Sequence, residues 1–299
     1  MDRILKRASI GPNNMKSVEG SRERLRTVVN LMGRPAADLA EIEETRIEGP
    51  EGSIPVRIYR PKKPQKSGKA PLVLFFHGGG WILGGLDTSE ETLRMLCKLS
   101  GAVIVSVDYR LAPEHAFPSG LEDCYISAVW AANNANALGC DPRKLVVSGE
   151  SAGGNLATAT CLLAKQRKGP KIAYQILVYP NVDMARDMSE HSSSEFGPTP
   201  AELEWMIGLY LRNGRRVKDP LVSPILGDLR GIPPALIFTA ENDPLREQDE
   251  DYAKKLRSAG VRARTVNYPG AVHGFWNFPS YFDSGDDAVR KAARAIKNL

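Results

Sequence analysis

Residues 144–154 read Lys-Leu-Val-Val-Ser-Gly-Glu-Ser-Ala-Gly-Gly, and this stretch decides the fold that the sequence predicts. Residues 145–147 form a short apolar run typical of a buried strand, and residues 152–168 have the composition of a helix. The turn between them, Gly149 to Gly153, carries Ser151 at its tip, where the first N–H groups of a helix favour negative charge. A Gly-x-Ser-x-Gly match alone is common in loops, so the interpretation depends on the strand and the helix around it.

The composition is that of a globular protein with a sizeable core. The chain has 299 residues, of which 42% are hydrophobic, enough for one large α/β domain or two smaller ones. No stretch suits a signal peptide or a membrane span, so we expect a cytoplasmic protein without stable membrane association. Cys97, Cys124, Cys140 and Cys161 lack Cys-x-x-Cys spacing and neighbouring histidines. We expect reduced, buried thiols rather than disulfides or a metal site.

The net charge of +5 raises the question of nucleic acid binding. Residues 1–34 hold eight basic and three acidic residues, so the whole excess lies in this N-terminal arm and the rest of the chain is balanced. The sequence has neither an RNA-binding aromatic motif nor a recognition-helix pattern. We therefore expect a solvated helical arm and no nucleic acid partner.

The rest of the chain alternates strands and helices. Strands are expected at residues 45–48, 54–60, 72–76, 102–107, 145–147, 172–179, 235–240 and 261–268. Helices are expected at residues 21–32, 119–138, 152–168, 201–212, 247–259 and 280–299. The first two strands suggest an antiparallel hairpin. The alternation after them predicts an α/β fold, with a mostly parallel sheet of about eight strands covered by helices on both faces.

The segment at 183–216 interrupts this alternation with a polar loop and a helix that has an apolar stripe. We therefore divide the chain into an N-terminal helical segment (1–44), a core (45–182), an insertion (183–216) and a second part of the core (217–299).

A serine hydroxyl needs a base within hydrogen-bond reach, and the base needs a third group that fixes its tautomer. In chain order an elbow serine is followed by its acid and then by its histidine. His273 follows the last expected strand, and Asp243 follows the strand at 235–240, so we expect both to act with Ser151. Asp243 could instead be a turn residue before Pro244, and Asp183 is the reserve acid.

The triple glycine at 78–80 follows the strand at 72–76. Because glycine lacks a Cβ, this backbone can approach a substrate closely and direct N–H groups at an oxyanion, together with the N–H of Ala152. A phosphate-binding loop would continue with Lys-Ser or Lys-Thr, whereas this one continues with Trp81. An oxyanion-binding loop is therefore expected here, and a flexible loop is the alternative.

Taken together, the chain resembles the hormone-sensitive-lipase-like esterases of the α/β-hydrolase superfamily. The resemblance rests on stretches that follow one another in the family's order, at residues 77–81, 109–114, 149–154, 243–246 and 273–275. It implies an α/β-hydrolase fold with a helical cap made by the N-terminal segment and the insertion. It also implies that Ser151, Asp243 and His273 are the catalytic triad. By the same resemblance, Gly79, Gly80 and Ala152 form the oxyanion hole.

The resemblance assigns His77 and residues 109–114 to the architecture rather than to catalysis. Glu150 departs from the family, which usually has Asp there, and this leaves the hydrogen-bond support of the turn in question. Trp81, Trp205 and Phe275 are candidate walls of the substrate pocket by position, although such residues can equally belong to the core.

The function expected from these residues is that of a serine carboxylesterase. It would hydrolyse small-molecule esters of short to medium chain length through an acyl-enzyme, with no metal or organic cofactor, as a monomer or homodimer. The alternatives are a lipase or an amidase with the same triad, or a non-catalytic small-molecule-binding protein of hydrolase fold.

Overall fold

The computed structural model describes residues 17–33, 40–62, 69–187, 197–212, 214 and 216–299. One eight-stranded sheet forms the centre, with the order β1-β2-β4-β3-β5-β6-β7-β8. The strands are β1 (Ala40–Gly49), β2 (Gly52–Pro61), β3 (Ala70–Phe76), β4 (Val103–Val107), β5 (Cys140–Glu150), β6 (Tyr174–Val178), β7 (Ala235–Asn242) and β8 (Ala263–Val272). β1 and β2 form an antiparallel hairpin, β2 is antiparallel to β4, and the other neighbouring pairs are parallel. The predicted mostly parallel sheet is confirmed.

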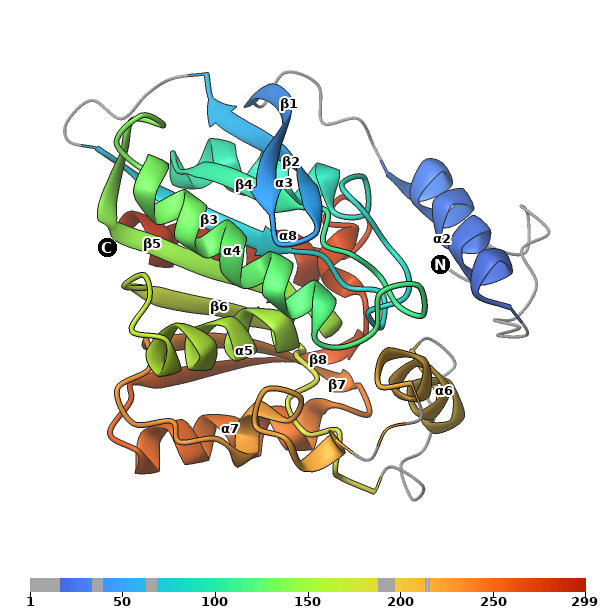
Figure 1. The fold of residues 1–299 in the computed structure, drawn as a ribbon. Coiled ribbons are helices and arrows are strands. Elements are labelled where there is room, and N and C mark those ends of the chain that lie inside the picture. The colour runs from blue at the N-terminus through green and yellow to red at the C-terminus, as the bar shows by residue number, and fades with distance from the viewer. Residues whose placement is uncertain (1–16, 34–39, 63–68, 188–196, 213, 215) are drawn as a thin grey trace.

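Helices cover both faces of this sheet (Figure 1). They are α2 (Val18–Met32), α3 (Glu90–Ser100), α4 (Ser119–Asn134), α5 (Ala152–Gln166), α6 (Pro200–Tyr210), α7 (Arg246–Ser258) and α8 (Asp283–Lys297), with short 3₁₀ turns η1 (Arg216–Lys218), η2 (Pro224–Leu226) and η3 (Phe275–Asn277). α4, α5 and α7 pack on one face and α3 and α8 on the other. α2 and α6 lie beside the end of the sheet at which β3 and β5 finish (Figure 1).

β3 shows why the central strands are apolar throughout. Leu72, Leu74 and Phe76 join the core under α4 and α5, whereas Val73 and Phe75 join the core under α3 and α8. All five side chains are fully buried. A parallel strand covered on both faces needs an uninterrupted apolar run, which is the pattern that identified this strand.

Two elements differ from the expectation. α3 was not predicted, because its buried face mixes apolar with polar side chains and the apolar pattern is interrupted. Its buried residues are Leu93, Leu96 and Cys97 together with Glu91, Thr92 and Ser100. β1 begins at residue 40 rather than 45, so the expected boundary after residue 44 falls inside a strand. The start of β1 was missed because its acidic residues do not form an apolar strand pattern. Glu43 and Glu44 lie on an edge strand and pair with arginines of β2.

The N-terminal arm is also more than a solvated helix. Met32 of α2 is fully buried, and Arg22 donates through Nε to the carbonyl of Ile82 at 2.9 Å. The same guanidinium binds both carboxylate oxygens of Glu114 at 2.8 Å. These contacts fix α2 to the loop after β3. The basic residues at 1–16 and the insertion residues at 188–196, including His191, lie outside the described residues.

The loop that follows β4 is held by a buried ion pair. Arg110 donates from Nε and Nη2 to the carboxylate of Asp123 at 2.9 Å, and its backbone N–H donates to the same group. The side chain of Asp123 is 0% exposed, in the first turns of α4. A buried carboxylate of this kind is stable only because its hydrogen bonds are made.

Asp123→Ala should lower the free energy of unfolding by about 3 kcal/mol, because it leaves the guanidinium and the N–H of Arg110 without this partner. Glu122→Ala is the matched control on the same helix. It removes a pair with Arg167 whose side chains are 27% and 42% exposed, and should cost about 1 kcal/mol or less. Chemical denaturation of both variants measures the difference, and equal losses would contradict this account.

Candidate active site

Ser151 lies in a strained turn between β5 and α5. Its φ and ψ angles are 54° and −120°, a combination that side-chain-bearing residues rarely adopt. Its N–H donates to the carbonyl of Val178 at 2.9 Å, and its carbonyl accepts from the N–H of Asn155 at 3.0 Å, the first contact of the helix. The hydroxyl therefore stands at the N-terminus of α5 and beside the ends of β5 and β6.

The glycines around Ser151 are required by close packing. A Cβ on Gly153 would overlap the carbonyl oxygen of Phe76 at the end of β3. A Cβ on Gly149 would overlap the carbonyl of Gly153 itself. The helix can therefore start directly against the strands only if both positions lack a side chain.

The structure brings Ser151, His273 and Asp243 together. The Nε2 atom of His273 lies 3.0 Å from the Oγ of Ser151, and its Nδ1 atom lies 2.7 Å from Oδ2 of Asp243. Asp243 is buried, and its other oxygen accepts from the N–H of Leu245 at 2.9 Å. Asp183, the reserve acid, instead accepts from the N–H of Ala185.

The register between β7 and β8 explains why Asp243 and His273 lie side by side. After an irregularity in β7, Asn242 is paired with Val272 of β8. The next residues along the two strands are Asp243 and His273, so both side chains emerge at the same level of the sheet. Parallel strands end at a common edge, and Ser151 follows β5 at that edge.

The surroundings of His273 favour its protonated form. Burial of the imidazole disfavours the charge, but Asp243 and Glu150 outweigh this effect and raise the pKa of His273 above its ordinary value. The ring of Tyr179 lies against the imidazole, with the ring centroids 4.4 Å apart. Burial raises the pKa of the Tyr179 phenol well above its usual value, so it stays neutral.

The glycine loop after β3 turns back toward Ser151. Gly79 and Gly80 have φ angles of 116° and 60°, which favour glycine. The carbonyl of Gly79 accepts from the N–H groups of Ile82 and Leu83, at 3.2 and 2.9 Å. A Cβ on Gly80 would overlap the Sδ atom of Met206, so this residue of α6 lies directly over the loop. The structure thus brings Gly79, Gly80 and Ala152 to the same cavity as Ser151.

His77 does not take part in this cavity. Its ring is buried and stacked on Tyr109, whose hydroxyl donates to the carbonyl of His77 at 2.7 Å. Burial lowers the pKa of His77 to about 4, so the imidazole is neutral. It supports the start of the glycine loop through a contact between Nδ1 and the carbonyl of Gly78 at 2.8 Å.

Glu150 links three parts of the site. Its Oε1 atom accepts from the N–H of Gly78 at 2.6 Å and from the side-chain amide of Asn277 at 3.2 Å. The amide oxygen of Asn277 in turn accepts from the hydroxyl of Ser89 at 2.8 Å. Burial raises the pKa of Glu150, partly offset by these hydrogen bonds. The longer acid therefore supports both the turn and the glycine loop, which answers the question that its presence raised.

A cavity of about 230 Å³ opens at Ser151. Of the three candidate wall residues, Trp81 lines it, whereas Trp205 and Phe275 are not among the described residues that do. Phe275 is fully buried against Tyr179 and belongs to the core under α8. It is the first residue of the turn η3, two residues after His273, and closeness in sequence gave no information on which way its ring points.

Several lining residues were not identified from the sequence. Leu25 comes from α2, Thr88 from the loop before α3, and Asn181 and Asn277 from turns after β6 and β8. None belongs to a motif, and only the folded chain brings them to Ser151. Leu203 and Met206 complete the wall on the side of α6, whose end is fixed by stacking of Tyr210 on Trp81, 4.7 Å between ring centroids.

Across the described residues, no three His, Cys, Asp or Glu side chains are grouped so that they could hold a metal ion. Within the same ranges, every helix is too short or too polar to cross a bilayer. The four cysteines are free and buried.

The chain is similar to a known protein family and to several characterised proteins. The family model of the alpha/beta hydrolase fold matches residues 73–277. The carboxylesterase NlhH of Mycobacterium tuberculosis is 39% identical over 292 residues, covering 94% of this chain and 89% of that protein. An arylesterase of Saccharolobus solfataricus is 39% identical over 249 residues, covering 82% of this chain and 80% of the relative.

Solved structures of esterases are also similar to this chain. A hyperthermophilic esterase from Pyrobaculum calidifontis superposes with a TM-score of 0.91 at 38% identity, covering 99% of this chain and 96% of that one. The carboxylesterase EstE1, cloned from a metagenomic library, superposes with a TM-score of 0.87 at 38% identity, covering 94% of this chain and 97% of the other.

Proposed function

The chain belongs to the hormone-sensitive-lipase-like esterases of the α/β-hydrolase fold family and is a carboxylic ester hydrolase, and we propose that Ser151, His273 and Asp243 perform the hydrolysis. The observation that carries this proposal is the continuous line of contacts from the Ser151 hydroxyl through the His273 imidazole to the Asp243 carboxylate, at 3.0 and 2.7 Å. These contacts lie in a cavity that Gly79, Gly80 and Ala152 also line.

The proposed reaction has two halves. Ser151 Oγ attacks the ester carbonyl carbon while Nε2 of His273 takes its proton, and Asp243 stabilises the imidazolium that forms. The N–H groups of Gly79, Gly80 and Ala152 stabilise the tetrahedral oxyanion. His273 then protonates the departing alcohol, and a water molecule activated by the same imidazole hydrolyses the acyl-enzyme and releases the carboxylic acid.

We further propose that the N-terminal segment before β1 and the insertion at 183–216 form a cap over the cavity, supported by the positions of Leu25 and Met206 in its wall. A cytoplasmic location is part of the proposal and is supported by the four free, buried cysteines. The protein is proposed to act as a monomer, or as a homodimer paired through the outer strand β8.

Ser151→Ala should lower kcat by about 10³-fold or more and abolish labelling by an organophosphate, because the nucleophile is lost while binding and the oxyanion contacts remain. Ser148→Ala is the matched control. Ser148 is also buried on β5, and its hydroxyl has no hydrogen-bond partner within the described part of the chain. Steady-state kinetics on a chromogenic ester should therefore separate the two variants, and an active, labelled Ser151→Ala protein would refute the assignment.

The pH profile tests the charge around His273. His273 must be neutral to act as a base, and the pKa of His273 is raised by Asp243 and Glu150 against the effect of burial, so activity should fall as the pH drops through this raised pKa. Glu150→Gln removes one negative charge and should move this acid limb to lower pH. Besides Asp243 and Glu150, the groups facing the imidazole are the Ser151 hydroxyl and the neutral ring of Tyr179.

Glu150→Asp is the complementary variant, because it keeps the charge but shortens the reach to Gly78 and Asn277. It should leave the acid limb close to its original pH while lowering kcat. If both variants moved the limb equally, hydrogen-bond support rather than charge would set the pKa of His273.

Acyl-chain length should be limited by Met206. Each methylene of substrate gains at most about 0.8 kcal/mol, about fourfold in kcat/KM, while it stays inside the cavity, and the cavity of about 230 Å³ is small. The wild type should therefore prefer short to medium chains. Met206→Ala should move the optimum to longer ones, whereas Met184→Ala, a buried methionine away from the cavity, should not. A series of p-nitrophenyl esters measures this, and a preference for long-chain triglycerides would indicate a lipase instead.

A further inference from the structure

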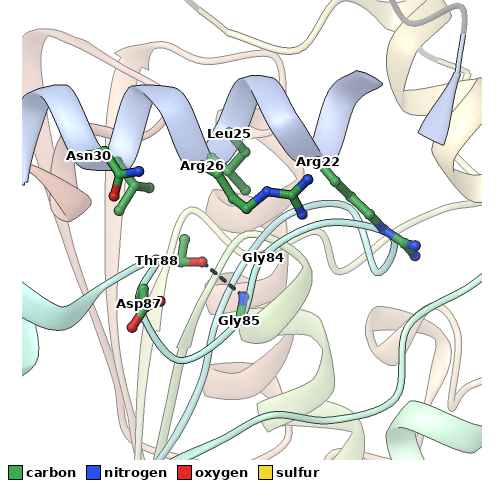
Figure 2. Close-up of a pocket in the computed structure, with 9 residues that line it drawn as sticks. Arg22, Leu25, Arg26, Asn30, Gly84, Gly85, Asp87 and Thr88 are labelled. Carbon is green, nitrogen blue, oxygen red and sulfur yellow. Dashed lines mark hydrogen bonds between the residues drawn. The ribbon is translucent and has the colours of Figure 1, made fainter. Parts of the chain in front are cut away.

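A trench beneath α2 shares lining residues with the cavity at Ser151. We use this name for the space between α2 and the loop at 84–88, which Leu25, Arg26, Asn30, Asp87 and Thr88 line among others (Figure 2). It has a volume of about 250 Å³, and a further cavity of about 230 Å³ extends it toward Arg94 and Phe278. Thr88 lines all three spaces, and Leu25 lines both the trench and the catalytic cavity.

The roof of the trench is one face of α2. Arg22, Leu25, Arg26, Val29 and Gly33 follow helical spacing and face the loop below. The contacts of Arg22 with the Ile82 carbonyl and with Glu114 fix this helix to the core. The floor is fixed as well, because the hydroxyl of Thr88 accepts from the N–H of Gly85 at 2.9 Å. Hydrogen bonds therefore hold both the helix above the trench and the loop below it in place.

The charges along the trench are already paired. Arg26 binds Glu19 at 2.8 Å, and Asp87 binds Arg57 of β2 at 2.8 Å. At the far end, Nε of Arg94 donates to Glu90 at 2.8 Å. An ionic ligand would therefore find no unbalanced charge of opposite sign on these residues. What the trench offers is hydrogen bonding, from the Asn30 amide, which Figure 2 shows on the side of α2 that faces the loop, and from the polar groups beside it.

The two sides of the catalytic cavity thus differ in chemistry. On the side of α6, Leu203 and Met206 present an apolar wall suited to an acyl chain. On the side of α2, Leu25 also lines the neighbouring trench, where apolar side chains stand beside polar groups and paired charges. The length of α2 from Leu25 to Gly33 is about 12 Å, at 1.5 Å per residue. An ester substrate with a short apolar acyl group and an extended hydroxyl-rich alcohol matches both sides.

We infer that the trench beneath α2 binds the neutral, polyhydroxylated alcohol arm of an ester substrate, such as an acetylated sugar. This inference rests on the proposed function, since the bond that is cleaved lies at Ser151. The acyl group would occupy the cavity below α6, and the alcohol that leaves would be held by the trench until the acyl-enzyme has formed. Hydrogen bonds to Asn30 would contribute to binding and hence mainly to KM.

Two acetate esters with the same acyl group test it: ethyl acetate and 6-O-acetylmaltose. The wild type should show the higher kcat/KM with the sugar ester. Asn30→Trp fills the trench and should lower kcat/KM for the sugar ester by about tenfold or more, chiefly through KM, while ethyl acetate changes less than about twofold. Thr27→Trp is the matched control, because Thr27 is exposed on the same helix, as Asn30 is, but is not among the described residues that line the trench. It should affect neither substrate.

Asn30→Leu serves as a second variant, since it keeps the size of the side chain and removes its hydrogen bonds. A selective loss with the sugar ester in either Asn30 variant supports the inference. Losses of equal size on both esters in both variants, no loss in either, or a wild type that prefers ethyl acetate would overturn it. Failure of the wild type to hydrolyse either ester would instead count against the proposed function.

Discussion

The contact on which this structure depends is the approach of the N-terminus of α5 to the ends of β3 and β5. The backbone of Gly153 lies so close to the carbonyl of Phe76 that no side chain fits between them. This approach holds Ser151 at φ 54°, with its hydroxyl beyond the strand ends and its neighbour Ala152 at the start of the helix. The strands around the turn hold Ser151 in this strained backbone conformation, because their side chains are buried on both faces of the sheet. The Ser151 hydroxyl, the glycine loop after β3 and the N-terminus of α5 lie together because the three backbones approach one another closely.

The carboxylates near this point act differently because their surroundings differ. Asp243 contacts the imidazole of His273 directly, and Glu150 reaches the same region through the glycine loop and Asn277. Asp249 of α7 is buried nearby, and burial raises the pKa of its carboxyl well above the usual value, with the charge of Asp243 adding to the effect. It therefore favours the neutral form. Asp243 and Glu150 are the two acids whose charges raise the pKa of the His273 imidazole.

The cavity takes its shape from elements that are remote in sequence. Met206 of α6 covers Gly80, and Tyr210 of the same helix stacks on Trp81, so the insertion is fixed to the loop that it covers. α2 is fixed on the other side by Arg22. α6 is apolar where it faces Ser151, whereas α2 adjoins paired charges and an amide. The proposed selectivity therefore depends mostly on these two helices rather than on the core.

The sequence by itself determined the order of the core strands and helices, the turn at Ser151 and the chain positions of Asp243 and His273. It could do so because a strand buried on both faces needs an apolar run, and a close backbone approach needs glycine. It could not reveal the first residues of β1, whose acidic side chains pair with arginines of β2, nor α3, whose buried face mixes apolar and polar side chains. The pairing of Asn242 with Val272, which aligns the acid with the imidazole, was decided only by tertiary structure, as were the inward position of Phe275 and the lining by Leu25 and Asn277. These features depend on contacts between distant segments, and a local pattern of residues carries no information about which distant segment it will meet.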